Sequence, residues 1–352
     1  MDLLPGVRAH EIETDRLRTH YLESGPAHAP VVVMVHGNLS TGRFYEHLMP
    51  DLPQYRVLAP DMRGFGRSQP LPLDATRGLD DWADDLDALL RALDVIGPVH
   101  LVGWSTGGGA IARFAQIHGA GARRVASLTL IDPVSPHGYG GVHADGTPCT
   151  PDFAGSGGGG ANPEVVRRLR EGDRSADSPF SIRNVMRGLY WAPTHTEPRE
   201  DVLVDEVLLT LVGDGGYPGD AVASENWPGS GPGTTGILNA LSPKYCDWTA
   251  LVDVEPKPPV LWTHGSADLV IADGSPLEFG TLGASGAVPG WPGPDAYPPQ
   301  PMVSQIRTLL ERYAAAGGRV RTEVLDGSGH GPQFDARERW LAVFTDFLAT
   351  IG

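Results

Sequence analysis

Cysteine is scarce in this chain. Its 352 residues include two cysteines, Cys149 and Cys246. Two cysteines are too few for a disulfide framework, and their spacing matches no metal-binding pattern. We therefore expect two free thiols, with a Cys149–Cys246 disulfide as the open alternative.

The chain also has few positively charged residues and no long apolar runs. The formal net charge is -16, and Lys244 and Lys257 are the only lysines. Such an acidic chain would repel a phosphate backbone, which argues against nucleic-acid binding. No apolar run reaches the length of a membrane span, and residues 1–6 lack the basic region and apolar core of a signal peptide. We expect a cytoplasmic protein that binds neither nucleic acid nor membrane.

What the chain does contain is a serine between two glycines at a predicted strand-to-helix turn. Residues 99–102 read as a short buried strand and residues 108–115 as the start of a helix, with Gly103, Ser105 and Gly107 between them. Neighbouring backbone comes close in such a turn, so a Cβ at either glycine would clash. The turn would raise the serine hydroxyl above the sheet, and the helix N-terminus would favour developing negative charge. This pattern is typical of a nucleophile elbow.

A second predicted strand, residues 31–35, ends in the loop His-Gly-Asn-Leu. We expect this loop to place the backbone N–H of Asn38 opposite that of Thr106. Two converging N–H groups can stabilise the oxyanion of a tetrahedral intermediate, so these two residues are the predicted oxyanion hole. Their neighbours Leu39 and Trp104 are predicted to line the substrate pocket.

The candidate acid and base follow two later predicted strands. Asp268 comes shortly after the strand 260–265, and His330 follows the strand 320–325. The chain order is therefore Ser105, Asp268, His330, each expected at the same edge of a parallel sheet. In such a triad the imidazole takes the serine proton, and the carboxylate holds the imidazole in its productive tautomer.

Other residues could fill two of these roles. Asp132 also follows a predicted strand, residues 127–131, and is the alternative acid. His36 and His264 compete with His330 as the base, but both lie in strand-to-loop turns. A histidine at such a turn more often packs or bonds to the backbone. The two glycines that flank His330 leave it free to swing toward the serine, so we favour His330, with an exposed loop histidine as the alternative.

Over nearly its whole length the chain resembles the α/β-hydrolase superfamily. His36-Gly37 is similar to the family's oxyanion loop, and residues 61–68 (Asp-Met-Arg-Gly-Phe-Gly-Arg-Ser) are similar to its D-x-R-G-x-G-x-S turn. Ser105, Asp268 and His330 fall on its triad positions. Residues 105–109 also resemble the elbow of the esterase and cofactor-free haloperoxidase branch, although Trp104 replaces the histidine often found there.

The resemblance implies an α/β-hydrolase fold, in which a mostly parallel twisted sheet carries helices on both faces and an inserted cap. Alternating strands and helices favour the same core, over residues 1–133 and 259–352, with an antiparallel edge hairpin over residues 7–24. We predict a mainly helical cap over residues 134–258. Its helices are expected near residues 163–171, 182–190 and 200–211. A Pro- and Gly-rich loop, residues 276–301, is expected to lack clear secondary structure and to border the active site.

These features predict a serine hydrolase that cleaves a carboxylic ester or lactone of a small to medium apolar substrate through an acyl-enzyme on Ser105. No metal or organic cofactor is expected. Aminopeptidase, carbon–carbon bond hydrolase and perhydrolase activities are the alternatives on the same triad, and a ligand-binding receptor is the alternative outside catalysis. An aminopeptidase would need acidic residues to hold the substrate amine, for which Glu164, Glu200, Asp205 and Glu206 are the candidates.

Overall fold

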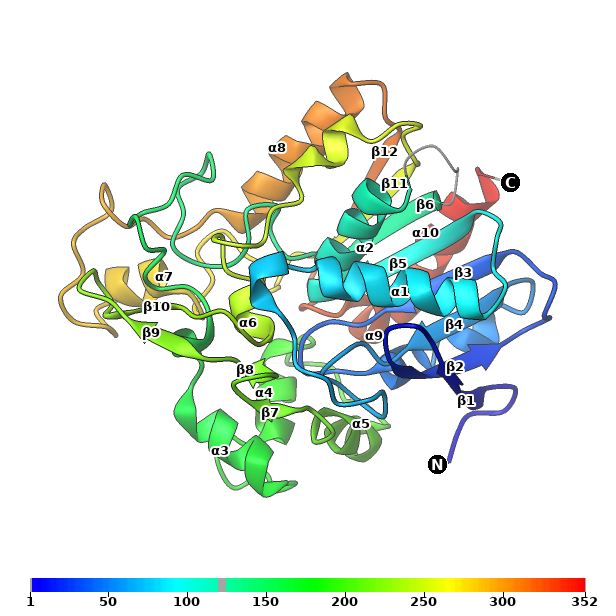
Figure 1. The fold of residues 1–352 in the computed structure, drawn as a ribbon, viewed down its shortest axis with the longest axis horizontal. Helices are drawn as coiled ribbons and strands as arrows, with labels where there is room; N and C mark the ends of the chain where they lie inside the picture. Colours follow the sequence, from blue (N-terminus) through cyan, green and yellow to red (C-terminus); the bar gives the residue numbers. More distant parts are fainter. Residues whose placement is uncertain (1, 120–124, 352) are drawn as a thin grey trace.

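The computed structural model describes residues 2–119 and 125–351 and is built around one large sheet (Figure 1). Its strands are β1 (Arg8–Glu13), β2 (Arg18–Ser24), β3 (Val31–Val35), β4 (Arg56–Pro60), β5 (Val99–Trp104), β6 (Val125–Ile131), β11 (Val260–Gly265) and β12 (Val320–Leu325). The eight strands lie in the order β1-β2-β4-β3-β5-β6-β11-β12. β2 runs antiparallel to both β1 and β4, and every pairing from β4 to β12 is parallel. The predicted edge hairpin is confirmed.

Burial explains why the central strands are almost continuously apolar. β3 has the sequence Val-Val-Val-Met-Val, and its last four residues are buried. A parallel strand covered on both faces cannot alternate polar and apolar residues, because neither face meets water. The edge strand β1, Arg-Ala-His-Glu-Ile-Glu, is mostly exposed and carries the charged residues that a central strand excludes.

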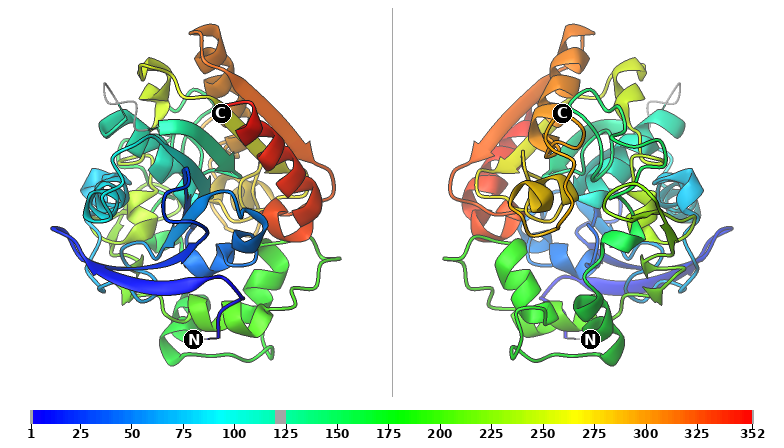
Figure 2. Two further views of the ribbon diagram at one scale, coloured as in Figure 1. Left: turned by 90° about the vertical axis from the view of Figure 1, so that its right-hand side faces the viewer. Right: turned by 90° about the vertical axis from the view of Figure 1, so that its left-hand side faces the viewer.

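Helices cover both faces of the sheet. α1 (Asp80–Ala92) and α2 (Thr106–Ile117) lie on one face, and α10 (Arg337–Ala349) lies on the other, as the left view of Figure 2 shows. α8 (Met302–Ala315) joins β11 to β12, and the short α9 (Pro332–Asp335) precedes α10. The predicted fold class, a mostly parallel sheet with helices on both faces, is confirmed.

Most of the predicted insertion, residues 134–258, lies on one side of the sheet, while its last part packs beside α8 (Figure 1). Its helices are α3 (Pro163–Glu171), α4 (Ile182–Leu189), α5 (Glu200–Val207) and α6 (Ile237–Ala240), so three helical stretches expected from the sequence are present. The segment also holds four short strands that form two two-stranded sheets, β7 (Val212–Gly213) with β8 (Tyr217–Pro218) and β9 (Ala221–Ala223) with β10 (Ser230–Pro232). Five 3-10 helices complete the described elements: η1 (Gly42–Tyr45), η2 (Met49–Asp51), η3 (Ala75–Arg77), η4 (Gly158–Gly160) and η5 (Thr249–Asp253).

The expectation that residues 276–301 lack clear secondary structure is wrong. This segment contains the helix α7 (Phe279–Ala284). The carboxylate of Glu278 caps α7 by accepting hydrogen bonds from the N–H groups of Gly280 (2.8 Å) and Thr281 (2.6 Å). Two glycines in six residues give α7 a low intrinsic helix propensity, so the cap and tertiary packing are what hold it.

The structure bears on two other sequence observations. None of the described helices is long and apolar enough to cross a membrane. Cys149 and Cys246 are both free thiols. Residues 1, 120–124 and 352 of the predicted core lie outside the described residues.

Candidate active site

The register of four neighbouring parallel strands brings the predicted functional loops to one edge of the sheet. The last residue of β5, Trp104, pairs with Ile131 at the end of β6, and Gly265 at the end of β11 pairs with Leu325 at the end of β12. The loops that follow β3, β5, β6, β11 and β12 therefore begin side by side. They carry Asn38, Ser105, Asp132, Asp268 and His330.

Ser105 lies in a tight turn between β5 and α2. Its backbone has φ 56° and ψ -120°, and its carbonyl accepts the N–H of Gly108 at 2.9 Å. A Cβ on Gly103 would lie 2.3 Å from the carbonyl oxygen of Gly107, and a Cβ on Gly107 would lie 2.2 Å from that of Val35. Both contacts are far inside van der Waals distance. The backbone of the elbow therefore requires glycine at both positions.

The loop after β3 lies directly against the serine. A Cβ on Gly37 would be 2.9 Å from the Cβ of Ser105. Among the described residues, neither the N–H of Asn38 nor that of Thr106 has a hydrogen-bond acceptor. Two such unpaired donors beside a serine fit an oxyanion site. The next residue, Leu39, holds the strained φ of 48° in this loop.

His330 and Asp268 form a buried pair. Nδ1 of His330 and Oδ2 of Asp268 are 2.8 Å apart, and His330 is 4% exposed. The other carboxylate oxygen, Oδ1, accepts the backbone N–H groups of Val270 (2.7 Å) and Ile271 (3.2 Å). Burial alone would lower the pKa of His330, but the charge of Asp268 and the hydrogen bond to it outweigh burial and raise that pKa.

The serine–histidine link is the one contact of the predicted triad that the structure does not form. In the part of the chain that the structure describes, the Ser105 hydroxyl makes no hydrogen bond. The loop between β12 and α9, which carries His330 and is called the histidine loop below, nevertheless lies beside the elbow. The indole N–H of Trp104 donates to the carbonyl of His330 at 2.7 Å. The rings of Trp104 and His330 are 5.5 Å apart. Contacts of this kind are often long without substrate and tighten in the Michaelis complex.

The two predicted pocket residues are largely covered by protein. Trp104 is 1% exposed and Leu39 is 7% exposed. Trp104 packs against Tyr190 and Phe334, with ring separations of 5.4 and 5.9 Å. The structure therefore gives Trp104 a clear packing role, and its contact with substrate stays a prediction.

The competing histidine in the oxyanion loop is held by backbone groups. His36 is fully buried, its Nδ1 lies 2.7 Å from the carbonyl oxygen of Gly37, and its Nε2 accepts the N–H of Met62 at 2.9 Å. Burial lowers the pKa of His36 to about 4, so the ring is neutral. Both ring nitrogens are used in joining the loops after β3 and β4. This is the structural role that the sequence favoured for His36.

Asp61, the first residue of the D-x-R-G-x-G-x-S turn, organises the neighbouring backbone. Its carboxylate accepts the N–H groups of Gly42 and Arg67, both at 2.9 Å, and lies 2.8 Å from Nδ1 of His20. A Cβ on Gly66 would lie 2.2 Å from this carboxylate. The turn is therefore joined to the segment that follows the oxyanion loop through Gly42, and to His36 of that loop through Met62.

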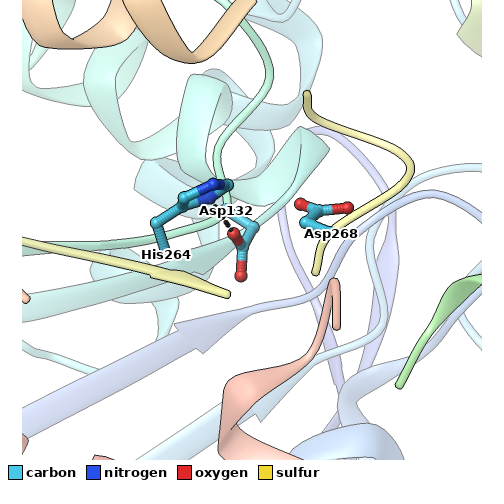
Figure 3. Close-up of side chains that lie close together, drawn as sticks. All are labelled: Asp132, His264 and Asp268. Carbon is cyan, nitrogen blue, oxygen red and sulfur yellow. Dashed lines mark hydrogen bonds and ion pairs between the residues drawn. The ribbon is translucent and has the colours of Figure 1, made fainter. Parts of the chain in front are cut away.

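The alternative acid, Asp132, lies beside the favoured one. One donor atom from each of Asp132, His264 and Asp268 lies within 4.8 Å of the others (Figure 3). Asp132 Oδ1 is 2.6 Å from Nδ1 of His264 and accepts the N–H of Gly265 at 3.1 Å. Two carboxyl groups and an imidazole are donors that a metal ion can use. The imidazole of His264 is already bonded to Asp132. The carboxylate of Asp268 is already bonded to His330 and to two backbone N–H groups.

Sequence reasoning missed Asp335, which fastens the histidine loop. Its carboxylate accepts hydrogen bonds from the hydroxyl of Ser328, from the N–H of Gly329 (2.8 Å) and from the N–H of Ala192 (2.7 Å). The three donors belong to two segments far apart in sequence. No local pattern around residue 335 signals this role.

Tyr190 is a second residue whose role only the structure reveals. Its hydroxyl donates to the carbonyl of Leu39 at 2.8 Å, which ties the 134–258 segment to the oxyanion loop. No local pattern around Tyr190 in the sequence indicates the partner of its hydroxyl.

The acidic residues that could have held a substrate amine are all paired with arginine. Glu206 is 1% exposed and lies 2.8 Å from Arg67. The other pairs are Glu164 with Arg167 and Arg168, Glu200 with Arg183 and Arg187, and Asp205 with Arg174. A substrate amine would have to displace a guanidinium at any of them, which weakens the aminopeptidase alternative.

Comparison with known proteins agrees with this geometry. The family model described as alpha/beta hydrolase fold matches residues 30–145. A non-heme chloroperoxidase of Burkholderia pyrrocinia is 37% identical over 124 residues, which cover 35% of this chain and 44% of that protein. A cis-3-alkyl-4-alkyloxetan-2-one decarboxylase of Xanthomonas campestris pv. campestris is 38% identical over 125 residues, covering 33% and 41%. The match thus spans less than half the length of these curated relatives.

Solved structures match over nearly the whole chain. An esterase from Exiguobacterium antarcticum superposes with a TM-score of 0.60 at 19% identity, covering 97% of this chain and 100% of the other. At this identity the similarity concerns the fold alone. The sheet edge described above is where that fold collects its functional loops.

Proposed function

Because this chain is a member of the α/β-hydrolase superfamily, we propose that it is a serine hydrolase that cleaves a carboxylic ester or a lactone through an acyl-enzyme on Ser105. The observation that best supports the proposal is the buried pair of His330 and Asp268, 2.8 Å apart, at the sheet edge that also carries the serine elbow. An imidazole fixed by a carboxylate beside a strained serine is the arrangement that acyl transfer needs.

In the proposed reaction the Ser105 hydroxyl attacks the substrate carbonyl carbon while His330 takes the hydroxyl proton. Asp268 holds the imidazole through Nδ1, so that Nε2 is the nitrogen that accepts. The unpaired N–H groups of Asn38 and Thr106 stabilise the oxyanion. The alkoxide leaves with the proton from His330, and a water molecule, deprotonated by His330, then releases the acid.

Two observations support an apolar ester or lactone substrate. Leu269 directly follows the acid in the chain and is 46% exposed, so it offers apolar surface next to Asp268. One relative is named for an oxetan-2-one, which is a cyclic ester. In this proposal residues 134–258 form the cap, residues 1–133 and 259–352 form the core, and Tyr190 holds the cap to the oxyanion loop.

The test is turnover of short-chain p-nitrophenyl esters and of simple lactones by the wild type and by Ser105→Ala. We expect the variant to lose at least about 10⁴-fold in kcat, because the nucleophile is removed. Ser285→Ala is the matched control, since Ser285 is exposed and bonds only to its own helix. A fluorophosphonate should label the wild type and Ser285→Ala, and peptide mapping should find the label on Ser105.

Two results would contradict the proposal. Label on a residue other than Ser105 would show that another nucleophile acts. A wild type that binds esters without turnover, with the same affinity in Ser105→Ala, would identify a ligand-binding receptor instead of a hydrolase.

A further inference from the structure

The loop that follows β11 holds the proposed triad acid through two peptide groups. Oδ1 of Asp268 accepts the N–H of Val270 at 2.7 Å and that of Ile271 at 3.2 Å. The other oxygen, Oδ2, is the one that lies 2.8 Å from Nδ1 of His330. Because the two N–H groups fix the first oxygen, they also set the direction in which the second one meets the imidazole. The orientation of these two peptide groups therefore governs the geometry of the acid–base pair.

Each of the two peptide groups is held on its opposite side by a side-chain hydroxyl. The N–H of Val270 shares its peptide group with the carbonyl of Leu269, which accepts the Ser275 hydroxyl at 2.7 Å. The N–H of Ile271 shares its peptide group with the carbonyl of Val270, which accepts the Tyr139 hydroxyl at 3.1 Å. Both peptide bonds are trans, so the C=O and the N–H of each point in opposite directions. Each peptide group is therefore clamped between a hydroxyl and the carboxylate.

The two hydroxyls also contact each other. Oγ of Ser275 and the hydroxyl oxygen of Tyr139 are 3.0 Å apart, and Ser275 is 0% exposed. Burial raises the pKa of Tyr139, so its hydroxyl keeps the proton that it donates. Hydrogen bonds that follow one another in a buried chain polarise each other, so donation to a carbonyl strengthens the N–H on the far side of the same peptide group. The hydroxyl pair thus reaches the carboxylate through the two peptide groups.

The surrounding chain fixes Tyr139 in this position. Gly138 and Gly140, which flank it, have φ angles of 76° and 84°. The buried side-chain amide of Gln300 donates to the carbonyl of Gly138 (3.1 Å) and accepts the N–H of Gly140 (2.6 Å). The N–H of Tyr139 itself donates to the carbonyl of Leu241 at 2.8 Å. A tyrosine whose backbone is held on both sides in this way presents its hydroxyl with little freedom to move.

We propose that Tyr139 and Ser275 are positioning residues, which orient the carboxylate of Asp268 through the peptide groups of residues 269–271. This inference rests on the proposed function, because it concerns the acid of the same triad. A catalytic group has to be held within ~0.5 Å of its productive position, and hydrogen bonds from neighbouring residues supply that precision. Because Tyr139 lies in the 134–258 segment, the pair also joins the proposed cap to the loop that carries the acid.

The kinetic test removes each hydroxyl through Tyr139→Phe and Ser275→Ala, and both in the double variant, with p-nitrophenyl acetate as substrate. We expect each single variant to lose about 5- to 20-fold in kcat with KM nearly unchanged, because a loosened acid misaligns the base and leaves substrate binding intact. The double variant should lose about 10²-fold, well short of the ~10⁴-fold that follows loss of the triad acid itself, since the carboxylate is still present.

Two control variants remove comparable buried hydroxyls elsewhere in the fold. The Tyr313 hydroxyl donates to the carbonyl of Pro258 at 2.6 Å, just before the start of β11 and thus at the opposite end of that strand from the acid. The Ser156 hydroxyl donates to a backbone carbonyl at 2.8 Å and contacts a second serine hydroxyl at 2.7 Å. We expect Tyr313→Phe and Ser156→Ala to lower the melting temperature about as much as the two test variants do, with kcat at the wild-type value. Equal losses of kcat in controls and test variants would overturn the proposal.

Proton NMR tests the orientation of the acid without substrate, so it separates this inference from the proposed function. The proton between His330 and Asp268 should give a far-downfield resonance in the wild type, which is assigned by its loss in Asp268→Asn. We expect this resonance to move upfield in both test variants, because a misdirected carboxylate is a poorer acceptor for the imidazole N–H. It should keep its wild-type position in both controls.

Two outcomes of the combined measurements would also overturn the proposal. One is a resonance and a kcat that both stay at their wild-type values in Tyr139→Phe and Ser275→Ala. The other is a resonance that moves in these variants while kcat is unchanged. If Tyr139→Phe fails to fold by circular dichroism, Ser275→Ala carries both readouts. A wild type that turns over no ester, but whose resonance moves in the test variants, would refute the proposed function and leave the orienting role of the two hydroxyls in place.

Discussion

Asp335 offers the sharpest test of how the histidine loop is held, through the substitution Asp335→Ala. The carboxylate accepts from Ser328 and from the N–H groups of Gly329 and Ala192. Gly329 is buried, so its N–H would lose its partner without reaching bulk water. Leaving a buried donor unpaired costs about 1–3 kcal/mol. With the buried Ala192 donor included, we expect a loss of about 2–4 kcal/mol in the free energy of unfolding.

That loss converts to a measurable shift in melting temperature. At ~2.1 cal/mol/K per residue, a chain of 352 residues has an unfolding entropy of about 0.7 kcal/mol/K, so the shift is about 3–5 °C. Because Gly329 precedes His330, the loop that carries the base should also lose its position. A displacement of ~1 Å can cost about 10²-fold, and we expect kcat to fall by about 10- to 100-fold with less change in KM.

Asp335→Asn is the matched control. Its amide oxygen can still accept the two N–H groups, and its amide N–H can donate to the Ser328 hydroxyl, so most stability and activity should remain. Calorimetry and p-nitrophenyl ester kinetics on the same preparations provide the assay. A melting temperature lowered as expected with unchanged kcat would refute the link between this carboxylate and the placement of His330. An unchanged melting temperature would refute the stability estimate itself.

Two further predictions concern the base and the elbow. The raised pKa of His330 means that the imidazole gains its proton, and loses its function as a base, at a higher pH than an ordinary histidine would. The acidic limb of kcat/KM should accordingly lie above the usual histidine range, and a limb below that range would contradict the charge assignment at Asp268. At the elbow, Gly107→Ala places a Cβ 2.2 Å from the carbonyl oxygen of Val35, and it should lower kcat/KM by more than about 10²-fold. Gly188→Ala in α4 meets nothing within 4 Å and should leave esterase activity unchanged, so equal losses in both variants would refute the steric argument.

The 134–258 segment is fixed to the rest of the chain by polar contacts as well as by packing. Glu206 on α5 is almost fully buried and lies 2.8 Å from Arg67 in the turn after β4. The carboxylate also accepts the hydroxyl of Thr41 at 2.9 Å and lies 3.7 Å from the guanidinium of Arg43. A buried carboxylate with these partners is expensive to expose, because separation would leave a charge unpaired. We expect this part of the segment to keep its place during turnover.

Local features of the chain were enough to predict the sheet and the elbow. The boundaries of β3 and β11 agree with the apolar runs, because burial on both faces of a sheet leaves a direct mark on sequence. The edge strand β12 was predictable from a different pattern, since its residues alternate between apolar and polar and are mostly only partly buried. The glycines around Ser105 were predictable for a similar reason, since a steric clash with adjacent backbone depends on a few residues of one turn. Because Asp268 and His330 each follow a strand of the parallel sheet, the sequence also predicted that both lie at the same edge of that sheet.

Contacts between distant segments could not be foreseen in this way. Asp132 and Asp268 both follow strands that end at that edge, and the sequence favoured Asp268 as the acid with Asp132 as the alternative. The hydrogen bonds pair Asp268 with His330 and Asp132 with His264, and no local pattern indicated the second pair. Likewise, no local sequence pattern indicated the helix α7 or the three hydrogen bonds that the carboxylate of Asp335 accepts. Their physical cause is long-range hydrogen bonding, whose partners are fixed when the whole sheet and its loops pack together.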